Sequence, residues 1–144
     1  MLNNVIAGIA IALNQEFGDD YEIYTEEIKQ DLKEPCFFVQ CLNPSMEQFL
    51  GRRYFRESQF CIQYFPETAE IVKECHEVGE AMYFCLEYIT CQGDDRPIRG
   101  TKMRYELKDD VLNFFVNYDL FVYKAEDKPL MEELEIETDV KEGG

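Results

Sequence analysis

The sequence has little of what catalytic and metal-binding sites commonly need. It contains one histidine, His76, and two serines, Ser45 and Ser58, and neither serine stands in a GxSxG motif. His76 lies in the segment HEVGE, which lacks the second histidine of the HExxH zinc-protease motif. None of the six cysteines forms a CxxC pair. A pairing of His76 with a thiol in space stays open, but no local pattern supports one. We therefore predict no enzyme, no catalytic residue, no metal and no cofactor.

Positive charge is also scarce. The 144 residues carry 14 basic and 30 acidic side chains, a formal net charge of −16 at pH 7. Such a chain repels polyanions, so we predict no sequence-specific nucleic-acid binding and no docking on an anionic membrane. No apolar run approaches the ~20 residues of a membrane-spanning helix, and the apolar segment 5–13 lacks the basic flank of a signal peptide. We expect an intracellular protein with reduced, buried thiols.

Apolar residues, by contrast, are abundant enough for one folded domain, at 46% of the chain with 14% aromatic. Helical periodicity predicts a helix over residues 3–17, which Gly18 ends, and a second from Thr68 to about Thr90. Strands are predicted over residues 21–24, 36–42, 52–65, 98–107 and 111–123, with a loop over 43–51. This order predicts an α+β fold: a mainly antiparallel sheet with two principal helices packed on it.

The last two predicted strands form a hairpin that turns at Asp109 and Asp110. In residues 111–123 the even positions from Leu112 to Val122 are apolar, while Asn113, Asn117 and Asp119 alternate with them. A slip of one residue would expose the whole apolar row, so the pairing is strongly specified. We also expect the edge of this long strand to be available for pairing across subunits.

The regular pattern stops near Lys124. We therefore predict a single domain over residues 1–124 and an acidic C-terminal tail over 125–144. Two interpretations of the tail stay open. It is either flexible and solvated, or docked on a partner through residues 130–137 as a strand or short helix.

The basic residues are unevenly distributed. All six arginines lie in two short segments, and Lys102 joins the second. Arginine suits protein interfaces because it forms planar, bidentate pairs with carboxylates. These cations therefore either face the acidic helix or tail of a neighbouring copy, or neutralise acids in their own subunit. Phe115 and Phe121 lie on the polar face of the last strand and predict a covered surface. The predicted interface residues are Arg52, Arg53, Arg56, Arg99, Lys102, Arg104, Phe115 and Phe121.

Several segments, in a fixed order, resemble a known family. They are EPCFF, LNPS, GRRYFR, YFP, RGTKM and FFVNY, and the likeness extends from about residue 5 to 135. Together they resemble the tail terminator proteins of phage-like elements and phage-tail-like particles in Gram-positive bacteria. The resemblance implies a small structural protein without catalytic residues. It implies a ring, typically sixfold, on the head-proximal end of the tail tube, which stops tube polymerisation.

The resemblance also implies partners and a location. The expected partners are further copies of the chain in a hexameric ring, the tail tube protein, and in some particles the sheath protein or the head–tail connector. The expected location is a virion or phage-tail-like particle assembled in the bacterial cytoplasm. The competing hypothesis is a small acidic adaptor or inhibitor that binds a soluble partner as a monomer.

Overall fold

The computed structural model describes residues 2–25, 32–43, 47–91, 96–124 and 134–136. Two helices, α1 (Leu2–Phe17) and α2 (Ile71–Cys85), pack against an eight-stranded sheet. The strands are β1 (Glu22–Tyr24), β2 (Cys36–Cys41), β3 (Glu47–Leu50), β4 (Arg53–Phe65), β5 (Tyr88–Thr90), β6 (Pro97–Lys108), β7 (Val111–Lys124) and β8 (Leu134–Ile136). Among the pairings of these described strands only that of β1 with β2 is parallel, so the predicted α+β fold is confirmed.

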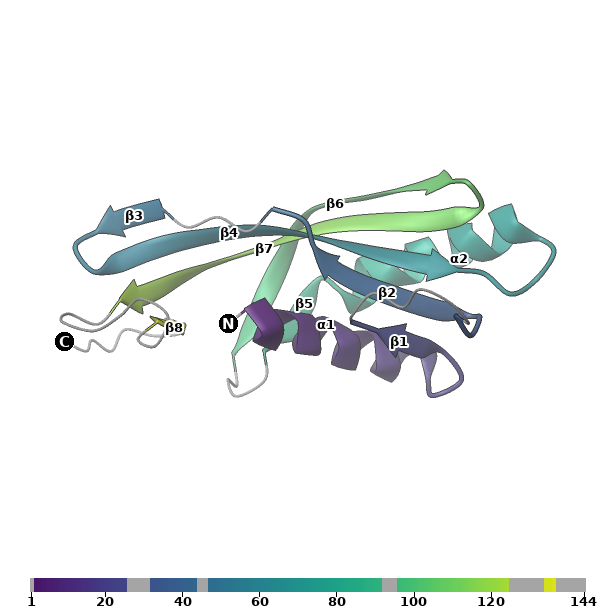
Figure 1. Ribbon diagram of the computed structural model, residues 1–144, viewed down its shortest axis with the longest axis horizontal. Helices are drawn as coiled ribbons and strands as arrows, with labels where there is room; N and C mark the ends of the chain where they lie inside the picture. Colours follow the sequence, from purple (N-terminus) through teal and green to yellow (C-terminus); the bar gives the residue numbers. More distant parts are fainter. Residues whose placement is uncertain (1, 26–31, 44–46, 92–95, 125–133, 137–144) are drawn as a thin grey trace.

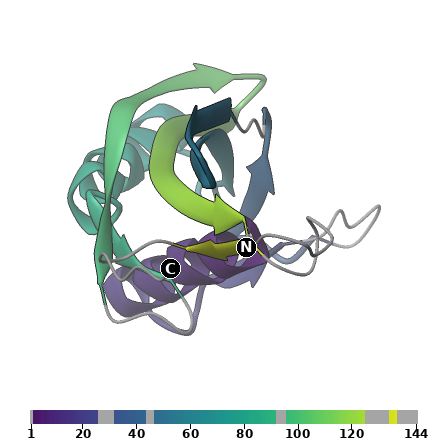
Figure 2. The same ribbon diagram turned by 90° about the vertical axis from the view of Figure 1, so that its left-hand side faces the viewer.

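The sheet curls around the apolar core. Its main path runs β1-β2-β4-β7-β6-β5, with β3 added to β4 and β8 added to β7. Figure 2 shows the curl end-on, with α1 along its lower side. Helix α1 contacts both β2 and β5, which lie towards opposite ends of the path. The helix therefore bridges the two ends of the curled sheet.

The periodicities of the sequence explain which side chains fill the core. On α1, Val5, Ile9 and Leu13 recur every four residues and are buried. On β4 and β7, the cross-strand pairs Phe60–Val116 and Ile62–Phe114 occupy the same face and are also fully buried. The two hairpin turn residues, Asp109 and Asp110, both have positive φ, which the predicted tight turn requires.

Two predicted element boundaries are wrong. The segment 43–51, predicted as a loop, contains β3, because a turn at Gly51 (φ +58°) lets Glu47–Leu50 fold back on β4. The second helix ends at Cys85, short of the predicted Thr90, and the chain continues into β5. Ile89 is buried although it lies in this short strand, and its position in the sequence coincides with the helical spacing on which the prediction was based.

The long strand β7 is central, which corrects the expectation of a free edge. It pairs with β4 on one side, and with β6 and then β8 on the other. Leu134–Ile136 of the predicted tail thus pairs with Val122–Lys124 of its own chain. The other residues of the predicted tail lie outside the described residues, so the division into domain 1–124 and tail 125–144 stays a prediction.

One end of the sheet extends past both helices. We call this part the arm and define it as β3, the turn at residues 51–52 (the arm turn), residues 53–57 of β4, residues 119–124 of β7, and β8. In Figure 1 the arm projects to the left, and neither helix lies over it. The arm therefore presents a part of the sheet that the helical layer leaves uncovered.

A carboxylate fixes the start of α2. Glu74 accepts hydrogen bonds from the Tyr64 hydroxyl (2.5 Å), the Glu67 and Thr68 backbone amides (3.0 and 2.9 Å) and the Thr68 hydroxyl (2.6 Å). Burial alone would raise the pKa of Glu74, but these hydrogen bonds outweigh it and hold the pKa below its usual value. The same side chain thus ties β4, the connecting loop and α2 together.

Candidate assembly surfaces

The first cluster of predicted interface residues lies in the arm. Arg52 is exposed in the turn between β3 and β4, next to Gly51. Arg53 begins β4 and is partly exposed, opposite Tyr123 of β7. Arg56 is more enclosed: its Nε atom is buried with no hydrogen-bond partner in the described part of the chain. Of the three, Arg52 is therefore the best placed to meet another molecule.

The second cluster lies along β6 and is partly neutralised within the subunit. Lys102 sits at an irregularity in the β6–β7 pairing, with φ +53°, and its Nζ lies 3.9 Å from a Glu57 carboxylate oxygen. Arg104 lies 3.7 Å from a Glu106 carboxylate oxygen. Arg99 is exposed near the start of β6. For Lys102 and Arg104 the structure thus supplies the same-subunit partners that were one of the two interpretations.

The two phenylalanines differ. Phe115 lies on the face opposite the core and is half-buried, with the Arg104 guanidinium 4.2 Å from the centre of its ring. Its cover is therefore a side chain of the neighbouring strand. Phe121 pairs with Phe55 through the backbone of β4 and β7, and its side chain lies outside the described residues.

Two carboxylates face each other at the root of the arm. Glu57 of β4 is directly opposite Asp119 of β7, and Lys102 lies beside Glu57. Burial first, and then the Glu57 charge, raise the pKa of Asp119, although Lys102 and a backbone hydrogen bond from Ser58 act in the other direction. Next to them Asn117 is only 7% exposed, and its Oδ1 has no hydrogen-bond partner among the described residues. The root of the arm is therefore polar, and the two carboxylates that meet there repel each other when both are charged.

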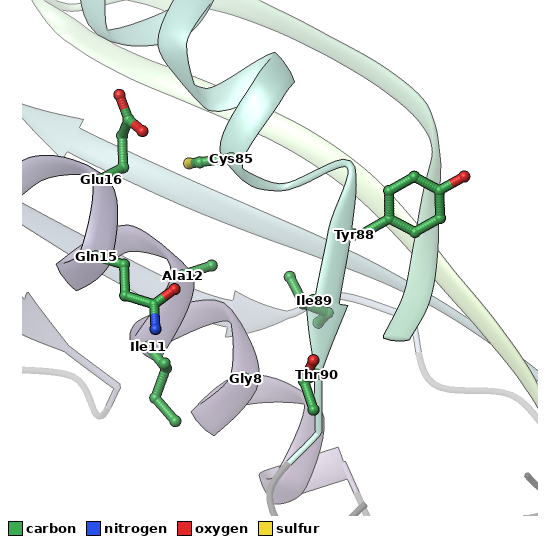
Figure 3. A pocket seen from close by; sticks show the side chains of 9 residues that line it. All are labelled: Gly8, Ile11, Ala12, Gln15, Glu16, Cys85, Tyr88, Ile89 and Thr90. Atoms are coloured by element: carbon green, nitrogen blue, oxygen red, sulfur yellow. The ribbon is translucent and has the colours of Figure 1, made fainter. Parts of the chain in front are cut away.

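A second surface was not predicted from the sequence. A groove of about 320 Å³ opens between α1, the end of α2 and β5. Figure 3 shows Ile11, Gln15 and Glu16 along α1 on one side, with Cys85 and Ile89 across from them. Ile11 is 49% exposed and Tyr88, also in the lining, is 55% exposed. This side of the molecule therefore combines accessible apolar surface with one carboxylate.

A close backbone approach forms the floor of this groove. A Cβ on Gly8 would lie 2.7 Å from the carbonyl oxygen of Thr90, so α1 rests directly on β5 only because residue 8 is glycine. The sequence does contain features that indicate such a surface: residues 2–17 have one glycine and a single charged residue, Glu16. In addition, Ile11 is apolar but lies outside the buried stripe of this helix.

The titratable and nucleophilic groups have ordinary structural surroundings. His76 is exposed on α2, with its Nδ1 3.0 Å from the Tyr105 hydroxyl. The six thiols are free, and burial raises the pKa of Cys36, Cys61 and Cys75 to about 11. In the part of the chain that the structure describes, no three His, Cys, Asp or Glu side chains are grouped to hold a metal ion. Over the same residues, neither helix is long and apolar enough to cross a membrane.

Comparison with known proteins identifies one family. A family model described as phage tail terminator protein matches residues 4–129, which is most of the chain. A search of curated proteins found no match.

Proposed function

The chain belongs to the phage tail terminator family, and from that premise we propose that its copies form a ring on the head-proximal end of a tail tube. The family is structural, and its members take part in tail assembly as components of the virion. In our proposal the ring blocks further addition of tube subunits and offers its outer side to the next component. A hexamer is the proposed ring size, as the resemblance of the sequence implies.

The observation that carries this proposal is the separation of two unlike surfaces in one subunit. The arm carries Arg52 at its exposed turn, while the rest of a chain with net charge −16 is dominated by carboxylates. Neither helix covers the arm (Figure 1). A surface of one kind that meets a different surface on the next copy gives a head-to-tail contact, and such contacts close into rings when the rotation permits.

The proposed mechanism is steric and electrostatic. Copies bind the last ring of the tube, and each places its arm against a surface of the next copy that carries a carboxylate. Because unlike charges attract over about 8 Å at physiological ionic strength, they guide subunits into register before close packing begins. Closure of the ring then leaves no surface of the kind that a tube subunit recognises. Sheath protein or a head–tail connector would dock on the outward face, and assembly would take place in the host cytoplasm.

Electron microscopy of particles made with and without the protein tests this function. Without it we expect tubes of uncontrolled length, and with it a narrow length distribution and a cap at one end. Supplying the Arg52→Glu variant should reproduce the loss of length control, whereas the Lys73→Glu variant, altered on the exposed face of α2, should behave like wild type. Normal tails in the absence of the protein, together with a one-to-one complex with a soluble partner, would support the monomeric adaptor instead.

A further inference from the structure

The groove between α1 and β5 lies on a different part of the subunit from the arm. Helix α1 and β5 flank the core, whereas the arm projects past both helices (Figure 1). In Figure 3 Glu16 and Gln15 lie on the α1 side of the groove. Because the groove and the arm lie apart on one subunit, a contact between the groove of one copy and the arm of another joins two copies head to tail.

Accessible apolar side chains mark the groove as a place for a protein partner. Two exposed large hydrophobic residues, Ile11 and Tyr88, belong to its lining, and the Tyr88 ring points away from α1 (Figure 3). Ile11 is accompanied in the lining by the apolar side chains of Ala12, Cys85 and Ile89. Accessible apolar side chains around a hollow are typical of surfaces that become covered in an assembly. A volume of about 320 Å³ accommodates a few side chains of a partner.

The charge at the groove selects the partner. Glu16 is the only charged residue of α1 and lines the groove, and none of the described residues that line it is Lys or Arg. Its field reaches the groove interior: burial and then Glu16 raise the pKa of the Cys85 thiol to about 12. A matching segment must therefore bring one cation flanked by apolar side chains. The turn of the arm has this composition, with exposed Arg52 followed closely by Tyr54 and Phe55, both partly exposed.

We propose that the groove between α1 and β5 receives the arm turn of a second copy of this chain, with Arg52 of one copy beside Glu16 of the next. This inference rests on the proposed function, because it names the receiving surface of the head-to-tail contact. It places Arg52 in this groove and not against the acidic helix or tail that the sequence suggested.

Disulfide trapping on assembled tails tests the contact. The background variant has Cys41 and Cys85, the two partly exposed thiols, replaced by Ser. Adding Gln15→Cys and Arg53→Cys, which leaves the Arg52 charge in place, should then give, on oxidation with copper phenanthroline, a ladder of covalent oligomers of the terminator. The matched pair Lys73→Cys with Arg53→Cys places the first thiol on α2 and should give only monomer.

The outcomes separate the inference from the proposed function. Tails that carry the terminator at one end but give no ladder from the 15/53 pair, or an equal ladder from the 73/53 pair, would overturn the groove contact and leave the function standing. A conjugate of the groove cysteine with the tube protein would also overturn it. Absence of the terminator from wild-type tails would instead defeat the function itself.

Reciprocal charge reversal covers the case in which the cysteine variants do not assemble. Glu16→Arg and Arg52→Glu should each reduce the fraction of capped tails at least tenfold, and the double variant should restore most of it. Circular dichroism of each variant establishes that the subunit still folds. A folded double variant that stays as defective as the single variants would contradict the pairing.

Discussion

The guanidinium carbon of Arg104 lies 4.2 Å from the centre of the Phe115 ring, across the β6–β7 pair. Both residues were among the predicted interface residues, and within one chain their side chains contact each other. Arg104 also lies 3.7 Å from Glu106. The exposed Arg52, in contrast, stands on a turn beyond the helices. Arg52 is therefore more accessible to another molecule than Arg104, which has contacts within its own chain.

This difference predicts a ranking of interface variants. Arg52→Gln should abolish most capping of tails, whereas Arg104→Gln should reduce it by less than twofold, because Arg104 already lies over the Phe115 ring and beside Glu106 in its own chain. Counting capped tail ends by negative-stain electron microscopy measures both. An Arg104→Gln effect as large as that of Arg52→Gln would contradict this ranking and assign β6 to the interface.

Glu74 should be the most sensitive single carboxylate for stability. Glu74→Ala leaves the buried Tyr64 hydroxyl and two backbone amides without their acceptor. We expect a loss of about 2–3 kcal/mol in the free energy of unfolding, measured by urea denaturation. Glu77→Ala, on the exposed side of the same helix, should cost less than about 0.5 kcal/mol.

The same residue predicts an acid-side pH dependence. The pKa of Glu74 in the folded state lies below its ordinary value of 4.5. Its stabilising contribution is therefore fully present above pH 4.5 and is lost as the pH falls through the lowered value. The stability difference between wild type and Glu74→Gln should shrink over that window. A difference that stays constant down to pH 2 would show that the carboxylate charge has no part in it.

Gly8 should tolerate no side chain. The Gly8→Ala methyl group would meet the Thr90 carbonyl oxygen at 2.7 Å, and a backbone atom cannot rotate away. We expect destabilisation of about 1–3 kcal/mol, despite the higher helix propensity of alanine. Ala10→Gly on the same helix provides a control for propensity alone, with an expected loss of about 1 kcal/mol. A Gly8→Ala variant more stable than wild type would show that α1 does not rest on β5.

Asp119→Asn should stabilise the fold near neutral pH. Asp119 faces Glu57, and its raised pKa means that the folded protein holds this proton more tightly than the unfolded chain does. Stability is therefore lost as the pH rises from the ordinary 3.8 through the raised value. Removing the charge should add about 0.5 kcal/mol at pH 7 and nothing at pH 3. Asp119→Asn that leaves the free energy of unfolding at pH 7 unchanged or lower, measured by urea denaturation, would contradict this prediction.

The regular elements followed from local patterns, since burial dictates side-chain periodicity. The row from Leu112 to Tyr118 and the stripe from Val5 to Leu13 are buried as their spacing predicts. β3 was missed because its four residues gain their structure from pairing with β4, a contact that no local pattern encodes. The end of α2 was misplaced because Ile89 satisfies the helical period from a strand.

The candidate surfaces were only partly accessible to sequence reasoning. The cluster of arginines predicted the arm turn as an interface, because the segregation of charge can be recognised in the linear sequence. Whether a cation has a partner depends on strand register, which brings Lys102 to Glu57 across an intervening strand. The groove joins residues of α1 with β5, distant in the sequence, so only the tertiary contact between Gly8 and Thr90 creates it.

Imaging the ends of purified tails at subunit resolution is the decisive measurement for the proposed ring. We expect a closed ring of identical copies of this chain at one end of every completed tube, with the arm of each copy against the next. Copies distributed along the tube, or a single copy bound at its end, would contradict it.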